Sequence, residues 1–139
     1  MSQPRIGVDL VPLARVGELL GELLGSGSRP LLGRMLSEHE LRISVTPDGA
    51  PDPAGLAGRL AAKEAVFKLF GATGQPVPWQ GIEILRGPGG RPEVRLAGPA
   101  ADLAARAGLG PIDISISHDG GFAIAVAAAV AVPVVPAVP

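Results

Sequence analysis

An acidic side chain interrupts what should be a buried helical surface. Glu64 shares a stripe with Leu60 and Phe67, at spacings that place all three on one side of a helix. Burying a carboxylate costs free energy unless a cation or hydrogen-bond donors face it. Glu64 could pair with Lys68, four residues later, on a solvated face. A bound metal ion would also explain why the acid interrupts an apolar stripe.

Asp9 is the second acid in an unexpected place. It lies between apolar residues in segment 5–11, whose composition is typical of a strand, and strands disfavour Asp. Asp9 could cap the helix that follows. Alternatively it could share one hard cation with Glu64, because Mg²⁺ takes one or two carboxylates and fills its remaining positions with water and phosphate oxygens. The second hypothesis predicts a magnesium site.

The histidines favour neither a hydrolase nor a zinc site. Ser117, His118 and Asp119 are neighbours in one strand and turn, whereas catalytic triads are assembled from distant segments, and no Gly-x-Ser-x-Gly elbow is present. His118 could donate to a phosphate or stabilise the turn with Asp119. We expect His39 to be solvated. Two isolated histidines and no cysteine make zinc improbable, and the lack of cysteine excludes disulfides.

Charge and hydropathy exclude further classes. A net charge of −1 lacks the basic excess of a nucleic-acid-binding domain. The longest apolar run, residues 122–132, is too short for a membrane span of about 20 residues. The first residues do not resemble a signal peptide, so we expect a cytoplasmic protein. The length suits a single domain at residues 1–131, followed by a Pro/Val-rich tail at residues 132–139.

The elements that must position these residues mix strands and helices. The order predicts an α+β fold in which an antiparallel sheet packs with the long helix. Strands 5–11 and 122–132 are apolar enough to be buried on both faces. We expect strands at residues 5–11, 82–85, 94–96, 112–117 and 122–132, helices at 13–24, 31–35, 54–70 and 99–107, and a capping box at residues 37–40.

Four segments together resemble one family, the holo-(acyl carrier protein) synthases, which are the small type of 4′-phosphopantetheinyl transferase. The resemblance spans roughly residues 5–128, in order and at the family's spacing. It rests on Ile6-Gly7-Val8-Asp9-Leu10-Val11 with Arg15, on residues 59–68 (RLAAKEAVFK), on Trp79 with Ile82-Glu83-Ile84 and Gly90-Arg91-Pro92, and on residues 114–119 (ISISHD) with Ala123 and Ala125.

The resemblance implies a homotrimer with three active sites in the clefts between neighbours. Its activity would move 4′-phosphopantetheine from coenzyme A to a serine of a carrier protein and release 3′,5′-ADP. Asp9 and Glu64 would hold Mg²⁺ against the pyrophosphate, and Lys68 would neutralise phosphate charge and protonate the departing 3′,5′-ADP. Which group takes the serine proton stays open. The implied coenzyme A contacts are phosphate contacts by Arg59, Lys63, Ser117 and His118, an adenine contact by Pro92, and close backbone approach at Gly71 and Gly74.

Three features depart from the family pattern. Pro12 replaces a usual acid, and Leu60 replaces a usual Phe. The first helix, usually basic for docking an acidic carrier, has Arg15 as its only base beside Glu18 and Glu22. We expect Arg15 to dock a specialised acyl or peptidyl carrier protein. Two alternatives stay open: a non-catalytic coenzyme A-binding or trimeric assembly module, and a different reaction on a coenzyme A thioester.

Overall fold

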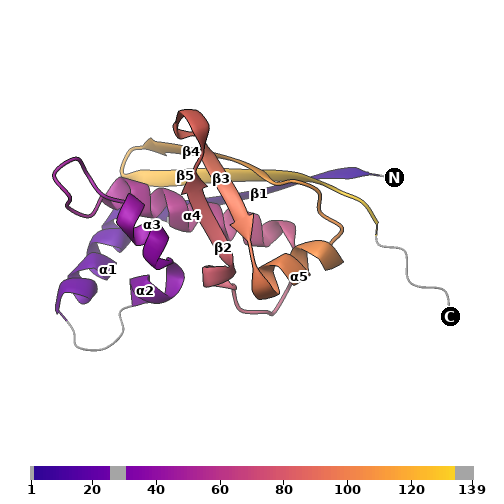
Figure 1. Ribbon diagram of the computed structural model, residues 1–139, viewed down its shortest axis with the longest axis horizontal. Helices are drawn as coiled ribbons and strands as arrows, with labels where there is room; N and C mark the ends of the chain where they lie inside the picture. The colour runs from indigo at the N-terminus through magenta and orange to yellow at the C-terminus, as the bar shows by residue number, and fades with distance from the viewer. Residues whose placement is uncertain (1, 26–30, 134–139) are drawn as a thin grey trace.

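The computed structural model describes residues 2–25 and 31–133 of the 139-residue chain. It has an α+β fold with one long helix and two antiparallel sheets (Figure 1). The expected elements are present within a few residues of their predicted ends. They are β1 (Gln3–Pro12), α1 (Leu13–Gly25), α2 (Leu31–Met35), α3 (Glu38–Ile43), α4 (Pro53–Leu69), β2 (Ile82–Arg86), β3 (Pro92–Leu96), α5 (Gly98–Arg106), β4 (Asp113–Asp119) and β5 (Phe122–Ala131).

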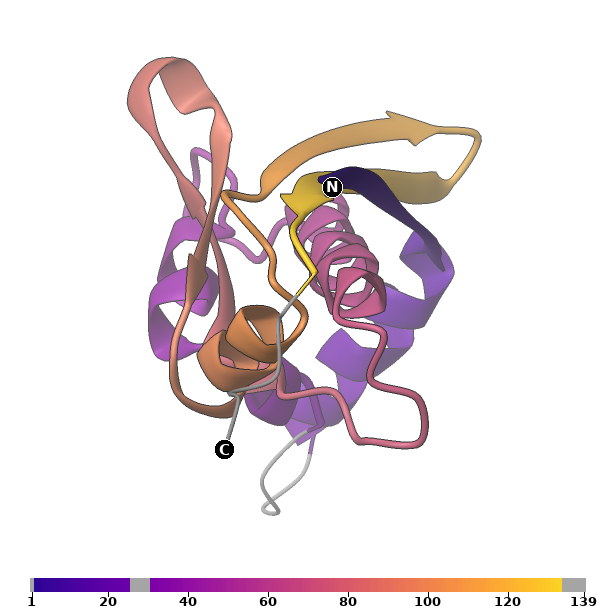
Figure 2. The same ribbon diagram turned by 90° about the vertical axis from the view of Figure 1, so that its right-hand side faces the viewer.

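The larger sheet has the order β1-β5-β4, so the last strand lies between the other two. Helix α4 packs against one face of this sheet (Figure 2). The helix approaches closely because β5 presents alternate buried alanines, such as Ala125, and because β1 has Gly7 opposite the helix backbone. A Cβ at Gly7 would overlap the carbonyl oxygen of Ala65. This contact fixes β1 against the middle of α4.

The other face of the sheet corrects one prediction. Segments 5–11 and 122–132 were expected to be buried on both faces, but α4 covers one face only and the described chain leaves the opposite one open. The side chain of Ile6 is 73% exposed and that of Leu10 is 53% exposed. We call this surface the outer sheet face; its apolar residues are Ile6, Val8, Leu10, Phe122, Ile124, Val126 and Val130.

Strands β2 and β3 form a separate two-stranded hairpin instead of extending the larger sheet, which also differs from the single sheet that we expected. The hairpin stands beside the N-terminal part of α4, and β3 lies next to β4 (Figures 1 and 2). Its loop needs glycine, because Gly89 and Gly90 both have positive φ. The separation opens a space between the hairpin and the larger sheet.

The two remaining predictions concern the C-terminal tail and membrane-spanning segments. Of the predicted tail, Val132 donates its amide to the carbonyl of Gly108, whereas residues 134–139 lie outside the described residues. Among the helices that the structure describes, none has the length and apolar character needed to cross a membrane.

Candidate functional site

The two acids predicted to share a metal lie next to each other. Val8 and Leu10 point to the outer sheet face, so the alternation of β1 turns Asp9 toward α4. There the carboxylate of Asp9 lies close enough to Glu64 to influence its ionisation. The Oδ2 atom of Asp9 is buried and has no hydrogen-bond partner among the described residues. Asp9 does not cap α1, whose first amide, that of Leu13, donates to the carbonyl of Gly121 at 2.9 Å.

The environment raises the pKa of Glu64 to about 7. Burial is the largest cause, followed by the interaction with the neighbouring Asp9 carboxylate, while Arg15 and Lys68 act in the opposite direction. Two crowded carboxyl groups with an unpartnered buried oxygen are chemically suited to one small hard cation such as Mg²⁺. Within the described ranges, no group of three or more His, Asp or Glu side chains could hold a metal. The donor set therefore fits Mg²⁺ better than zinc.

Lys68 completes this cluster, but it pairs with Asp9 and not, as the helical spacing suggested, with Glu64. Its Nζ donates to the carbonyl of Val8 at 2.7 Å and lies 3.3 Å from Oδ1 of Asp9. The lysine therefore bridges α4 to β1 instead of pairing with Glu64 along the helix. About half of its side chain is exposed, so the ammonium can also reach an anion that approaches the carboxylates.

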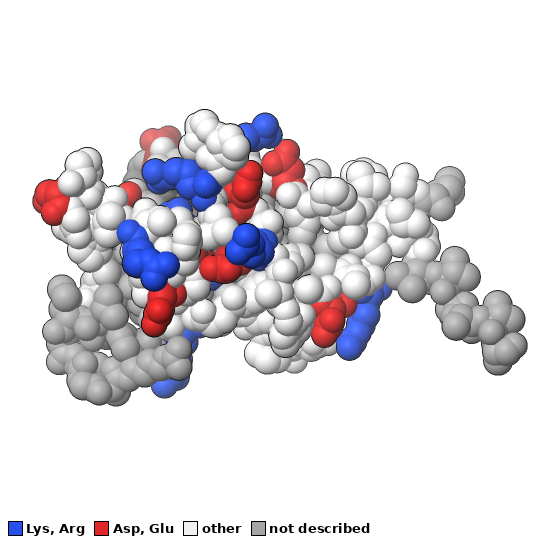
Figure 3. Space-filling view, viewed as in Figure 1, with Lys and Arg blue, Asp and Glu red and all other residues white. Residues whose placement is uncertain are grey.

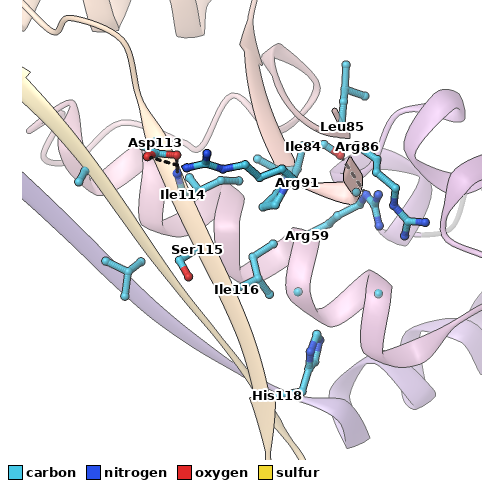
Figure 4. Close-up of a pocket in the computed structure, with 16 residues that line it drawn as sticks. Arg59, Ile84, Leu85, Arg86, Arg91, Asp113, Ile114, Ser115, Ile116 and His118 are labelled. Carbon is cyan, nitrogen blue, oxygen red and sulfur yellow. Dashed lines mark hydrogen bonds and ion pairs between the residues drawn. The ribbon is translucent and has the colours of Figure 1, made fainter. Parts of the chain in front are cut away.

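A cleft of about 550 Å³ lies between the β2–β3 hairpin, the N-terminal half of α4 and β4 (Figure 4). Its size is in the range of small-molecule sites. Arg59, Arg86 and Arg91 line it together with His118, whereas Asp113 is the acid in its lining. Arg91 reaches from the hairpin to Asp113, with 3.5 Å between Nη2 and Oδ2. The excess of cations suits a ligand that carries several phosphate groups.

Two of the predicted phosphate contacts line this cleft. His118 lies beside Gly58 and its Nε2 is 2.8 Å from the carbonyl oxygen of Ala54, so the ring donates there if that nitrogen is protonated. Arg59 is almost completely buried, which lowers its pKa, and its Nε donates to the carbonyl of Ile84 at 2.9 Å. Pro92, predicted near adenine, also lines the cleft.

Lys63 departs from its predicted phosphate contact. Its side chain is fully buried; its Nζ lies 2.6 Å from Oε1 of Glu40 and donates to the carbonyl of Trp79 at 2.8 Å. Burial lowers the pKa of Lys63, and the charge of Glu40 acts against that shift. Since the ammonium faces these partners inside the protein, Lys63 holds α4 to its neighbours and does not line the cleft.

The other predicted residues lie around the two sites. Ser117 is exposed on β4 outside the cleft lining, which contains Ser115 instead. Gly71 and Gly74 both have positive φ in the turn after α4. Arg15 is exposed on α1, and its charge reaches Glu64.

Sequence reasoning gave no role to Arg86, Arg91 or Asp113. The cluster of glycines and Arg91 in the hairpin loop was visible, but the hairpin's position beside β4 was not. Only that position brings these side chains into the cleft.

The carboxylate pair and the basic cleft face different sides of α4. Glu64 and Arg59 are five residues apart, which corresponds to a rotation of about 140° around the helix. Asp9 lies on the edge strand β1, whereas His118 lies on β4 at the opposite edge of the sheet. Within one chain these two groups are therefore poorly placed to act on one small region of a ligand.

Comparisons with known proteins identify the family to which this chain is similar. The sequence model of the 4′-phosphopantetheinyl transferase superfamily matches residues 5–127. A holo-[acyl-carrier-protein] synthase of Frankia casuarinae is 36% identical over 129 residues, covering 93% of this chain and 98% of the relative. The synthase of Desulforudis audaxviator is 38% identical over 133 residues, covering 90% and 91%.

Solved structures give the same result. A Chronobacterium ammoniagenes ACPS–CoA complex superposes with a TM-score of 0.72 at 32% identity, covering 91% of this chain and 96% of that one. The Helicobacter pylori holo-[acyl-carrier-protein] synthase in complex with coenzyme A gives a TM-score of 0.70 at 28% identity, covering 90% and 99%.

Proposed function

Because the chain belongs to the 4′-phosphopantetheinyl transferase superfamily and is an enzyme of the holo-[acyl-carrier-protein] synthase type, we propose that it transfers 4′-phosphopantetheine from coenzyme A to a serine of an acyl or peptidyl carrier protein, with Mg²⁺ as cofactor and release of 3′,5′-ADP. The observation that carries the proposal is the convergence of Asp9 and Glu64 from distant segments. We also propose that the protein is located in the cytoplasm.

The basic cleft would bind the nucleotide part of coenzyme A. Arg59 and His118 would contact its phosphates, Arg86 and Arg91 would add positive charge from the hairpin, and Pro92 would lie against adenine. Positive φ at Gly71 and Gly74 would let the turn after α4 approach the cofactor. Ser117 remains a proposed phosphate contact from β4. Lys63 is omitted, since its ammonium is engaged inside the protein.

The carboxylate pair would act at the pyrophosphate. Asp9 and Glu64 would hold Mg²⁺, which supplies charge stabilisation to the phosphoryl group. Lys68, beside Asp9, would neutralise charge on the leaving phosphate and donate a proton to it. Phosphoryl transfer depends mainly on positioning and charge stabilisation, so a site with two carboxylates, one lysine and a basic cleft has the required parts.

We also propose that the active unit is a homotrimer with its sites between neighbouring copies. The outer sheet face is a contiguous apolar surface, and surfaces of this kind commonly mark interfaces. Since the carboxylate pair and the cleft face different sides of α4, a neighbouring copy would bring one beside the other. A single copy would then lack half of the site.

Replacing Ile6 by lysine is expected to give monomers and to lower transfer activity at least tenfold, because it places a charge in the proposed apolar interface. Sedimentation velocity and a transfer assay measure both effects. The control is Arg95→Glu, which reverses a charge at an exposed position of β3, away from the outer sheet face. This variant should keep the assembly. Monomeric wild-type protein with full activity would contradict the proposal.

The raised pKa of Glu64 predicts a pH dependence of metal binding. Mg²⁺ must displace the proton that Glu64 holds below about pH 7, so the apparent affinity should be about tenfold lower at pH 6 than at pH 8. The same raised pKa favours the folded, metal-free protein at low pH, and this contribution is lost as the pH rises through about 7. Calorimetric titration with Mg²⁺ at both pH values checks the first effect, and equal affinities would contradict it.

The proposed function is tested by incubating the protein with coenzyme A, Mg²⁺ and a panel of apo-carrier proteins. We expect one carrier to gain the mass of a phosphopantetheine group, measured on the intact protein. The described exposed surface of α1 includes both Arg15 and Glu18, so the modified carrier should have a less acidic docking face than usual. Tight coenzyme A binding without modification of any carrier would favour the non-catalytic module. Turnover of a coenzyme A thioester alone would favour the other reaction.

A further inference from the structure

Glu40 on α3 is a fully buried carboxylate outside both the acidic pair and the cleft lining. Its Oε1 lies 2.6 Å from Nζ of Lys63 and accepts the amide of Ser37 at 2.9 Å, which closes the capping box of α3. Its Oε2 accepts the amide of Ile84 at 2.9 Å. A buried charge with this many partners is costly to disturb.

Ile84 connects Glu40 to the cleft. It lies in the middle of β2, and its amide bonds to Glu40 while its carbonyl accepts Nε of Arg59 at 2.9 Å. Both side chains thus satisfy one backbone unit of a two-stranded hairpin, and such hairpins are marginally stable without further contacts. Glu40 and Arg59 together attach the hairpin to the helices.

Arg59 is 6% exposed, and among the described residues only its Nε is bound by the protein. Its terminal nitrogens are not among the buried unpartnered atoms, and the residue lines the cleft, so they remain for a ligand. Glu40 lies near enough to stabilise the charge of Arg59 as well as that of Lys63. One buried acid therefore offsets two buried cations.

We propose that Glu40 is a positioning residue for coenzyme A: through Ile84 and the charge of Arg59, it aims the terminal nitrogens of Arg59 at a phosphate of the ligand. The inference rests on the proposed function, since it takes the cleft to be the coenzyme A site. Glu40 touches no substrate; it acts through Arg59.

The test compares two folded variants that differ only at residue 40. Lys63→Met alone keeps the hydrogen bond between the Ile84 amide and Glu40. Glu40→Gln combined with Lys63→Met removes both buried charges and approximately keeps the volumes of the two side chains. Calorimetry with 3′,5′-ADP should show near wild-type affinity for the first and about tenfold weaker binding for the second. In steady-state assays the variant with both substitutions should have a higher KM for coenzyme A than Lys63→Met alone. The kcat values of the two variants should differ less than threefold.

A double-mutant cycle separates positioning from a loss of stability. Arg59→Ala should weaken 3′,5′-ADP binding about thirtyfold in Lys63→Met but less than threefold in the variant that also lacks Glu40. Val16→Ala, on the buried face of α1, controls for destabilisation and should leave the affinity unchanged.

Additive effects, or equal affinity of the two variants, would overturn the inference. If wild-type protein bound neither coenzyme A nor 3′,5′-ADP, the proposed function itself would fail.

Discussion

Replacing Glu64 by glutamine is expected to lower kcat for carrier modification about a thousandfold, because the amide cannot supply the anionic oxygen that the metal site requires. Binding of 3′,5′-ADP in the basic cleft should change little, since Glu64 does not line it. Without metal at pH 8 the variant should melt at a higher temperature than wild type, because Glu64 no longer repels Asp9.

The matched control is Glu38→Gln, which makes the same chemical change at an exposed position on α3. Its transfer rate should stay within twofold of wild type. Rapid-quench assays of carrier modification and thermal melts measure both variants. A Glu64→Gln enzyme that retained most of its kcat would remove the metal role of the acidic pair.

Replacing Gly7 by alanine is expected to destabilise the fold by about 3 kcal/mol. The new Cβ would overlap the carbonyl oxygen of Ala65 and lie 3.3 Å from Cβ of Lys68, so β1 would have to move away from α4. Neither obstacle is the end of a flexible side chain. The same movement would separate Asp9 from Glu64 and reduce transfer activity in the protein that remains folded.

Gly21→Ala is the control for this prediction, because nothing lies within 4 Å of its added Cβ on α1. It should stabilise the protein by about 0.5–1 kcal/mol through the higher helix propensity of alanine. Urea unfolding curves of both variants give the comparison. A Gly7→Ala protein as stable as wild type would show that β1 and α4 do not approach as closely as described.

The proximity of Asp9 and Glu64 could be predicted from the sequence because the signal is local, and the metal site itself stays a prediction. An acid in an apolar strand and another in an apolar helical stripe are each out of place, and one shared ion explains both. The packing of α4 on the sheet then brings Asp9 and Glu64 together.

The basic cleft could not be predicted in the same way, because it depends on where the β2–β3 hairpin stands. Arg86 and Asp113 are 27 positions apart, and neither has an unusual neighbour in sequence. Lys63 was misjudged for a related reason. Its partner Glu40 was recognised as part of a capping box, but the pattern gave no sign that the same carboxylate was buried against α4.

The outer sheet face shows a further limit of sequence patterns. Val8 and Val11 are both apolar, yet Val11 is buried by the chain itself whereas Val8 is 48% exposed. An apolar residue in a strand indicates that something covers it, but not whether the cover is the same chain or another copy.

The most direct measurement is anomalous diffraction from crystals grown with Mn²⁺ and coenzyme A. We predict one manganese peak about 2.1 Å from an oxygen of Asp9 and an oxygen of Glu64, in contact with the pyrophosphate. Coenzyme A bound in the cleft with manganese elsewhere, or with Asp9 and Glu64 turned away from each other, would contradict the account.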